Sequence, residues 1–104
     1  MANSRVLVVD DDVHVRRTLH VALHANGYDV EEVGTGQAAI ERTNADPADL
    51  VILDLGLPDI DGVEVCRELR RWSDLPIIVL SAAGDDAAKV RALDEGADDY
   101  VTKP

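Results

Sequence analysis

The stretch LVILD at residues 50–54, followed by LGLPDIDG at residues 55–62, decides the fold of this chain. A short apolar run between turn residues is typical of a strand buried on both faces of a parallel sheet. Asp54 then lies where the strand leaves the sheet, which is the edge where open α/β sheets bind ligands. Taken alone, this aspartate is equally well explained as a turn or helix-capping residue.

Four further stretches are predicted to be strands, and helices are predicted between consecutive strands. The predicted strands cover residues 6–9, 28–33, 50–54, 77–80 and 100–102, and the predicted helices cover residues 13–26, 37–43, 62–71 and 85–95. This alternation implies a parallel sheet with right-handed crossovers. The fold class is therefore α/β, with a flavodoxin-like, doubly wound sheet of five strands in the order 2-1-3-4-5. In the first helix, Val15, Leu19, Ala22 and Leu23 are predicted to face the sheet.

The length, composition and charge of the chain limit the functions that it can have. The chain has 104 residues, of which 46% are hydrophobic, so it has room for one domain with a real core. Its net charge of −11 argues against direct contact with nucleic acid or an anionic membrane and suits a cation or a basic partner. No apolar run approaches the roughly 20 residues of a membrane span, and residues 1–5 lack a signal-peptide pattern. We therefore expect a cytoplasmic protein.

Two other features have ordinary explanations that we prefer. The single cysteine, Cys66, excludes an intramolecular disulfide, and we expect a small buried hydrophobe rather than a reactive thiol. His20 and His24 are one helical turn apart, which permits metal binding, but no third ligand is near in the sequence. We expect them to lie on a solvated helix face.

Chemistry-bearing residues follow four of the predicted strands. They are Asp10 and Asp11, Asp54, Ser81 and Lys103. In the order 2-1-3-4-5, these strand ends converge in one shallow cleft. Carboxylates so close together repel one another, and a hard divalent cation such as Mg²⁺ relieves the repulsion. The set suits phosphoryl transfer to a carboxylate, with Asp54 as the nucleophile.

With these motifs, the chain resembles the receiver domain of two-component response regulators, the CheY-like family. The matching segments are residues 8–12, Asp54, Leu57-Pro58, Asp61-Gly62, Ser81-Ala82 and residues 96–104. The segment GADDY at 96–100 and the pair Lys103-Pro104 are similar to the OmpR/PhoB class of transcription regulators. Within that class, residues 54–59 and 89–103 are similar to the potassium-responsive KdpE type.

The resemblance implies that Asp54 accepts a phosphoryl group from a sensor histidine kinase in a Mg²⁺-dependent reaction. The implied ligands are Asp10, Asp11, Asp54 and the backbone carbonyl of Gly56 for the metal, and Ser81 and Lys103 for the phosphoryl oxygens. The domain is then a signalling switch that promotes its own phosphorylation and dephosphorylation, and not an enzyme acting on another substrate. It controls an attached effector domain that regulates transcription.

The resemblance also implies how the switch works. On activation, Ser81 shifts toward the phosphoryl group and Tyr100 turns inward, and the Lys103-Pro104 peptide is cis. A pre-existing equilibrium then moves toward a homodimer formed through the fourth predicted helix (residues 85–95) and the fifth predicted strand (residues 100–102). The residues that match charged positions of that interface are Lys89, Asp98 and Asp99.

The sequence departs from the family pattern at its carboxyl end, where neither a fifth helix nor a DNA-binding domain follows. Residues 1–104 are therefore expected to be a receiver domain truncated before helix 5, with DNA contacted only through the missing effector domain. An apolar strip beside the last strand would then be bare. We expect non-native self-association or domain swapping to cover it.

Three alternative functions share part of this sequence pattern. A phosphatase of the haloacid dehalogenase type would also use an aspartate after the first predicted strand together with Mg²⁺. However, His14 stands where that family has Thr or Val, and the chain is too short for a cap domain. Turnover of a phosphomonoester would identify such a phosphatase. A flavodoxin-like FMN module is disfavoured because the aspartates after strand 1 would repel phosphate. A pseudo-receiver, which only binds partners, would have lost the acidic set or the lysine, and both are present.

Overall fold

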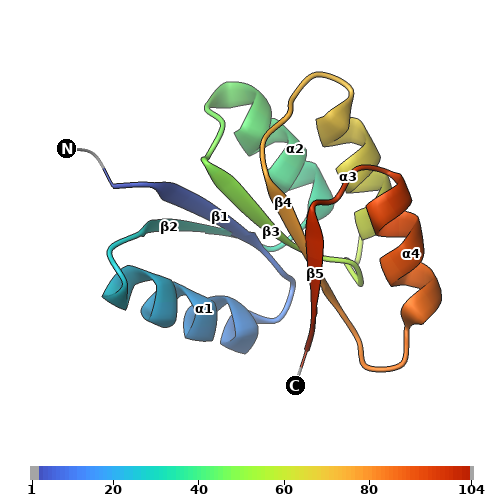
Figure 1. The fold of residues 1–104 in the computed structure, drawn as a ribbon. Helices are drawn as coiled ribbons and strands as arrows, with labels where there is room; N and C mark the ends of the chain where they lie inside the picture. Colours follow the sequence, from blue (N-terminus) through green and yellow to red (C-terminus); the bar gives the residue numbers. More distant parts are fainter. Residues whose placement is uncertain (1–2, 104) are drawn as a thin grey trace.

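A computed structural model describes residues 3–103, in which five parallel strands form one sheet with helices on both faces (Figure 1). The strands are β1 (Arg5–Val9), β2 (Asp29–Val33), β3 (Leu50–Asp54), β4 (Ile77–Ser81) and β5 (Asp99–Thr102). The helices are α1 (Val13–Ala25), α2 (Gly36–Ala45), α3 (Gly62–Arg70) and α4 (Asp86–Asp94). The order β2-β1-β3-β4-β5 confirms the predicted topology. Every predicted element is present, with ends that differ by at most a few residues.

The two faces of the sheet have separate cores because side chains alternate along each strand. On one face, β1 contributes Leu7 and Val9 to a core that α2, α3 and α4 cover. On the other face, Val6 and Val8 pack beneath α1. The central strand β3, with neighbours on both sides, is buried along almost its whole length. Asp54, the last residue of β3, is therefore held in a fixed position within the sheet.

Each helix begins at a residue whose side chain accepts a backbone N–H of the first turn. The caps are Asp12 for α1, Thr35 for α2, Asp61 for α3 and Asp85 for α4. Such oxygens satisfy N–H groups that have no partner inside the helix. All four caps end a loop that leads from a strand to the next helix, at the carboxyl end of the parallel sheet, and three of the four are aspartates. The capping residues thus also place carboxylates there.

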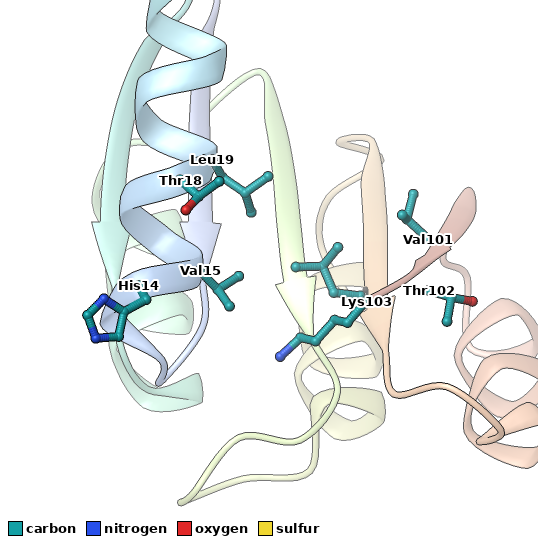
Figure 2. A pocket seen from close by; sticks show the side chains of 8 residues that line it. His14, Val15, Thr18, Leu19, Val101, Thr102 and Lys103 are labelled. Atoms are coloured by element: carbon teal, nitrogen blue, oxygen red, sulfur yellow. The ribbon is translucent and has the colours of Figure 1, made fainter.

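The face under α1 is only partly covered. Val15, Leu19 and Leu23 pack on the sheet as predicted, whereas Ala22 is exposed. The stripe at i, i+4 and i+8 points at the strands, and Ala22 lies outside this stripe on the exposed part of the helix. Beside it, between α1 and β5, is an apolar groove of about 320 Å³ (Figure 2). Its lining comprises His14, Val15, Thr18, Leu19, Leu80, Val101, Thr102 and Lys103.

Helix α4 turns small residues inward and larger apolar ones outward. Ala88 and Ala92 are buried, while Val90 is 56% exposed and Leu93 is 39% exposed. All four residues of β5, including Tyr100, are exposed as well. This side of the molecule therefore presents apolar residues to its surroundings. No helix within residues 3–103 combines the length and apolarity that crossing a membrane requires.

Cys66 is fully buried, and burial raises the pKa of its thiol, as expected for a small core residue. The two histidines behave differently from each other. His24 is exposed, but Nδ1 of His20 lies 2.7 Å from Oε2 of Glu32 on β2. The expectation of a solvated face is therefore correct for His24 and wrong for His20. The strand β2 supplies a carboxylate that the helix pattern alone does not reveal.

Candidate functional site

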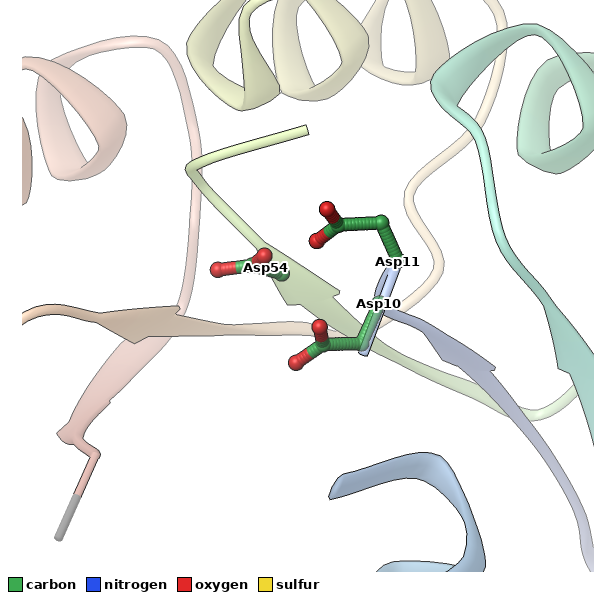
Figure 3. Close-up of side chains that lie close together, drawn as sticks. All are labelled: Asp10, Asp11 and Asp54. Carbon is green, nitrogen blue, oxygen red and sulfur yellow. The ribbon is translucent and has the colours of Figure 1, made fainter. Parts of the chain in front are cut away.

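Three aspartates meet at the carboxyl end of the sheet. Asp10 and Asp11 follow β1 and Asp54 ends β3, and Figure 3 shows their side chains gathered around one point. They are neighbours because Val9 pairs with Leu53 in the register of β1 and β3. One carboxylate oxygen from each lies within 4.8 Å of the others. The sequence-based prediction that these residues converge is therefore met by the fold.

The three aspartates differ in burial. Asp10 is completely buried and Asp54 is 4% exposed, whereas Asp11 is exposed. Burial raises the pKa of Asp54 above its ordinary value, although contacts with Lys103 and the N–H of Gly56 favour its charged form. The Gly56 N–H donates to Oδ1 of Asp54 over 3.2 Å. Burying two carboxylates side by side is costly unless a cation joins them.

Lys103 supplies one such cation. Its backbone N–H donates to the carbonyl of Ser81 over 2.8 Å, which continues the pairing of β4 with β5 and aims the side chain back along the sheet edge. The ammonium Nζ lies 3.0 Å from Oδ2 of Asp10 and 3.0 Å from Oδ1 of Asp54. Burial favours a lower pKa for Lys103, but the contacts with the two carboxylates outweigh it and raise the pKa. One ammonium therefore forms ion pairs with two carboxylates.

Two buried polar atoms at this edge are left incompletely satisfied. Oγ of Ser81 has no hydrogen-bond partner among residues 3–103, and Oδ2 of Asp10 has only its ion pair with Lys103. Buried polar atoms in folded proteins nearly always have partners, so these two are unusual. They lie at the ends of β4 and β1, where the charges also gather. Both are suited to a ligand that approaches from solution.

The donor set fits a hard divalent cation. Asp10, Asp11 and Asp54 offer oxygen atoms only, which Mg²⁺ prefers, and the partly exposed position of the group leaves room for water ligands. Within the described chain, this is the one group of at least three acidic, histidine or cysteine side chains close enough to share an ion. Gly56 lines the same cleft; the predicted role of its carbonyl as a ligand stays a prediction.

The cleft has a volume of about 470 Å³. Its lining consists of Asp11, Asp12, Asp54, Leu55, Gly56, Asp61, Ala82, Asp85, Ala88, Arg91 and Lys103. Ala82 is small and exposed, so nothing bulky at that position shields Asp54. The cleft is thus open to a reactant the size of a phosphoryl donor.

The loop that follows Asp54 is held at both ends. Gly62 is packed so tightly that a Cβ there would lie 2.5 Å from Cα of Leu55. Asp59 accepts the N–H groups of Gly36 and Gln37 over 2.8 and 2.9 Å, which joins this loop to the start of α2. These backbone hydrogen bonds, from Gln37 and then Gly36, lower the pKa of Asp59. The glycine and the aspartate of the quoted motif therefore shape the cleft wall.

Sequence reasoning missed two arginines near the site. Arg16 on α1 donates to the backbone carbonyl of Asp10 over 2.7 Å and also reaches Glu32. Arg91 on α4 lines the cleft. A weak signal exists for each, since Arg16 lies one turn after the cap Asp12 and Arg91 lies one turn after the buried Ala88. Neither spacing distinguishes a cleft residue from an ordinary surface arginine.

Of the residues expected to form the switch, Ser81 ends β4 and Tyr100 lies on β5. Of the expected interface residues, Lys89 lies on α4, Asp99 on β5 and Asp98 between these two elements. Tyr100 is 43% exposed at the sheet edge, with Nζ of Lys89 5.0 Å from its ring centre. Oδ2 of Asp98 accepts the N–H of Ile77 and a guanidinium N–H of Arg70, each over 2.7 Å. Asp98 is therefore already engaged within its own chain.

The third interface position, Asp99, accepts the N–H of Tyr100 over 2.8 Å and is exposed. The expected cis peptide between Lys103 and Pro104 lies outside the described residues.

Comparison with known proteins agrees with this geometry. The model of the response regulator receiver domain matches residues 6–104. The transcriptional regulatory protein KdpE of Mycobacterium tuberculosis is 52% identical over 99 residues, which are 95% of this chain and 44% of that protein. The KDP operon transcriptional regulatory protein KdpE of Escherichia coli is 48% identical over 101 residues, 97% of this chain and 45% of that protein.

Solved structures give the same result. The crystal structure of a response regulator from Chloroflexus aurantiacus matches with a TM-score of 0.94 and 36% identity, and the match covers 99% of this chain and 87% of that one. The chain spans less than half the length of the curated relatives it matches.

Proposed function

The chain belongs to the response regulator receiver domain family, and from this premise we propose that Asp54 accepts a phosphoryl group in a Mg²⁺-dependent reaction. The observation that supports this most is the convergence of Lys103 with Asp10 and Asp54, with the ammonium 3.0 Å from each carboxylate. The incoming group is a phosphoryl group from the phosphohistidine of a sensor histidine kinase. The reaction changes this protein itself and no other substrate.

Asp54 acts as the nucleophile. Its Oδ1 contacts both Lys103 and the N–H of Gly56, so Oδ2 is the oxygen left free to attack phosphorus. The attack needs the charged carboxylate, and the contacts at Oδ1 favour that form against the effect of burial. The phosphorus–oxygen bond to Asp54 forms as the bond between phosphorus and the donor breaks.

Lys103 and Ser81 bind the transferred group. Lys103 then exchanges a carboxylate partner for a phosphoryl oxygen, and the buried hydroxyl of Ser81 donates to another oxygen. That hydroxyl is free to do so because no described residue bonds to it. When bound, Mg²⁺ would be held by Asp10, Asp11, Asp54 and the carbonyl of Gly56, and would offset charge on the phosphoryl oxygens.

We further propose that phosphorylation favours a second conformation of the domain. Ser81 shifts toward the phosphoryl group, and Tyr100 turns from its exposed position toward the space that Ser81 vacates. A shift of this kind biases an equilibrium between two forms. The edge position of Tyr100 and its loose contact with Lys89 are compatible with such a movement.

The activated form is proposed to make a homodimer through α4 and β5. Val90 and Leu93 on α4 are exposed there, and so is Tyr100 on β5, whose ring contacts Lys89 of α4. Lys89, Asp98 and Asp99 surround these apolar residues with charges of both signs. Asp98 would have to exchange its contact with Arg70 for one across the interface.

The whole regulator, by this proposal, controls transcription in the cytoplasm through an effector domain that carries the DNA contacts. The support is that the KdpE proteins it resembles are named as transcriptional regulators. The strongly acidic receiver domain is itself unsuited to binding DNA, with a net charge of −11.

The decisive test uses acetyl phosphate with and without Mg²⁺, with the intact mass as the readout. The native chain should gain one phosphoryl group only when Mg²⁺ is present, and Asp54→Asn should gain none. Asp74→Asn, at an exposed position outside the cleft, is the matched control and should behave as the native chain. A folded native chain that gains no mass would refute the proposal, and it would favour a pseudo-receiver.

A further inference from the structure

Arg91 is the second positive charge of the cleft. It lies on α4 and lines the cleft together with Asp54 and Lys103. Its nearest charged neighbour is Asp61, whose Oδ2 is 3.8 Å from Nη2 of Arg91. That distance is too long for a hydrogen bond, and 60% of the Arg91 side chain is exposed. Its guanidinium donors are therefore available to a reactant.

The other arginines on this side of the molecule are occupied. Arg67 binds both carboxylate oxygens of Glu95 over 2.9 Å each and also contacts Glu64. Arg70 donates to backbone carbonyls and to Asp98. Within residues 3–103, Arg91 makes no hydrogen bond of this kind. Among the described residues of the cleft, Arg91 is thus a cation whose N–H donors are not used in a hydrogen bond.

The charges that line the cleft suggest a role for a cation at the position of Arg91. Five aspartates line the cleft, namely Asp11, Asp12, Asp54, Asp61 and Asp85. Lys103 is already engaged by two carboxylates before any reactant arrives. A phosphoryl donor is itself an anion and is repelled by such a rim. A free arginine matches the oxygens of a phosphoryl group, which it can bind with two parallel N–H donors.

We propose that Arg91 attracts and orients the phosphoryl donor at the cleft mouth, and so sets the rate of phosphorylation and the preference for highly charged donors. This inference rests on the proposed function of Asp54. In the reaction with acetyl phosphate, Arg91 binds the donor's phosphoryl oxygens while Oδ2 of Asp54 attacks phosphorus. The bond from phosphorus to the acetyl oxygen breaks, and acetate leaves with the electron pair.

The test compares Arg91→Gln with Arg67→Gln, which changes the net charge equally but lies outside the cleft. The apparent second-order rate constant for acetyl phosphate should fall by about two- to five-fold in Arg91→Gln, the range for a partly exposed charge pair. The deficit should shrink at high salt, because screening weakens such attraction, and with phosphoramidate, which carries less negative charge. Arg91→Lys should recover part of the rate.

A third variant, Asp61→Asn, separates a direct role from an indirect one. Asp61 caps α3, and asparagine retains the capping oxygen. If Arg91 acts on the donor, removing the Asp61 charge leaves the rate unchanged or raises it. If Asp61→Asn instead slows phosphorylation as much as Arg91→Gln, Arg91 acts through the helix start and the inference is wrong.

Two further results would overturn the inference in different ways. If Arg91→Gln and Arg67→Gln react at equal rates with equal salt dependence, while Asp54 is still phosphorylated in the presence of Mg²⁺, the role of Arg91 is refuted. The proposed function of Asp54 is then unaffected. Failure of the native chain to be phosphorylated refutes the proposed function and this inference together. Thermal melting of each variant confirms that the compared proteins are folded.

Discussion

Nζ of Lys103 lies 3.0 Å from Oδ1 of Asp54, so the end of the edge strand β5 provides the counter-charge for the end of the central strand β3. The same ammonium holds Asp10. This contact stabilises two buried carboxylates, and it also places a cation where a phosphoryl group would arrive. Stability and reactivity therefore depend on the same side chain.

Replacing Lys103 by methionine should reduce both properties. The free energy of unfolding should fall by about 1–3 kcal/mol, because two buried carboxylates lose their cation. Phosphorylation by acetyl phosphate should slow by about 100-fold or more, as expected when a donor to the reacting oxygens is removed. Urea denaturation and intact mass measure the two effects. Lys89→Met is the control, and a Lys103→Met protein that reacts at the native rate would contradict the prediction.

Asp54→Asn should stabilise the metal-free protein. Burial raises the pKa of Asp54 in the folded state, so the folded state holds the Asp54 proton more tightly than the unfolded state. Stability is therefore favoured at low pH and is lost as the pH rises through the folded pKa. The gain in melting temperature from Asp54→Asn should be small in acid and larger at neutral pH. Asp74→Asn should show no such trend, and a pH-independent gain would count against burial as the cause.

Mg²⁺ should stabilise the native chain, because a ligand that binds only the folded state adds stability. At a concentration of 100 times the dissociation constant, the gain is about 2.7 kcal/mol. Asp11→Asn should abolish most of this gain while leaving metal-free stability almost unchanged, since Asp11 is exposed. Thermal melting with and without Mg²⁺ is the measurement. An unaltered Mg²⁺ response in Asp11→Asn would remove Asp11 from the metal site.

Asp59, in the loop after Asp54, should contribute to the stability of the folded protein in a pH-dependent way. Hydrogen bonds from Gln37 and Gly36 lower the pKa of Asp59 in the folded state. Its stabilising contribution is therefore present above its ordinary pKa and is lost as the pH falls through the folded pKa. Asp59→Ala should lower the midpoint of urea denaturation at neutral pH. The difference in midpoint between the native chain and the variant should become smaller in acid. Asp94→Ala, on the exposed side of α4, is the control.

The apolar groove beside α1 should make the polypeptide of residues 1–104 self-associate at high concentration. Val101 lines this groove and is 52% exposed, so burying it against a second copy is favourable. Val101→Glu should shift sedimentation toward monomer. Val21→Glu, on the exposed face of α1 outside the groove, should have little effect. A clean monomer for the native 104-residue chain at high concentration would refute this prediction.

Much of the architecture follows from local patterns. The run at residues 50–53 is apolar throughout because β3 is covered on both faces, and the caps Asp12, Asp61 and Asp85 each mark a helix start. The alternation of strands and helices indicates a parallel sheet, and the flavodoxin-like strand order then brings the charged strand ends together. These features could be predicted because they depend on each residue's own element.

The finer contacts of the site could not be predicted in this way. Three contacts each join segments far apart in the sequence: His20 with Glu32, Asp59 with the start of α2, and Arg91 with Asp61. The outward orientation of Val90 likewise depends on how α4 is rotated against its neighbours. No local periodicity encodes these relations.

The sequence by itself determined the order of the elements and which acidic and basic residues end the strands, because hydrophobic periodicity and capping are properties of short segments. Only the tertiary structure decided that Lys103 is shared by two buried carboxylates and that Arg91 lines the cleft with no hydrogen bond to another residue of 3–103. The physical reason is that such contacts depend on strand register and helix rotation. Both are set by packing of the whole chain and not by any one stretch of it.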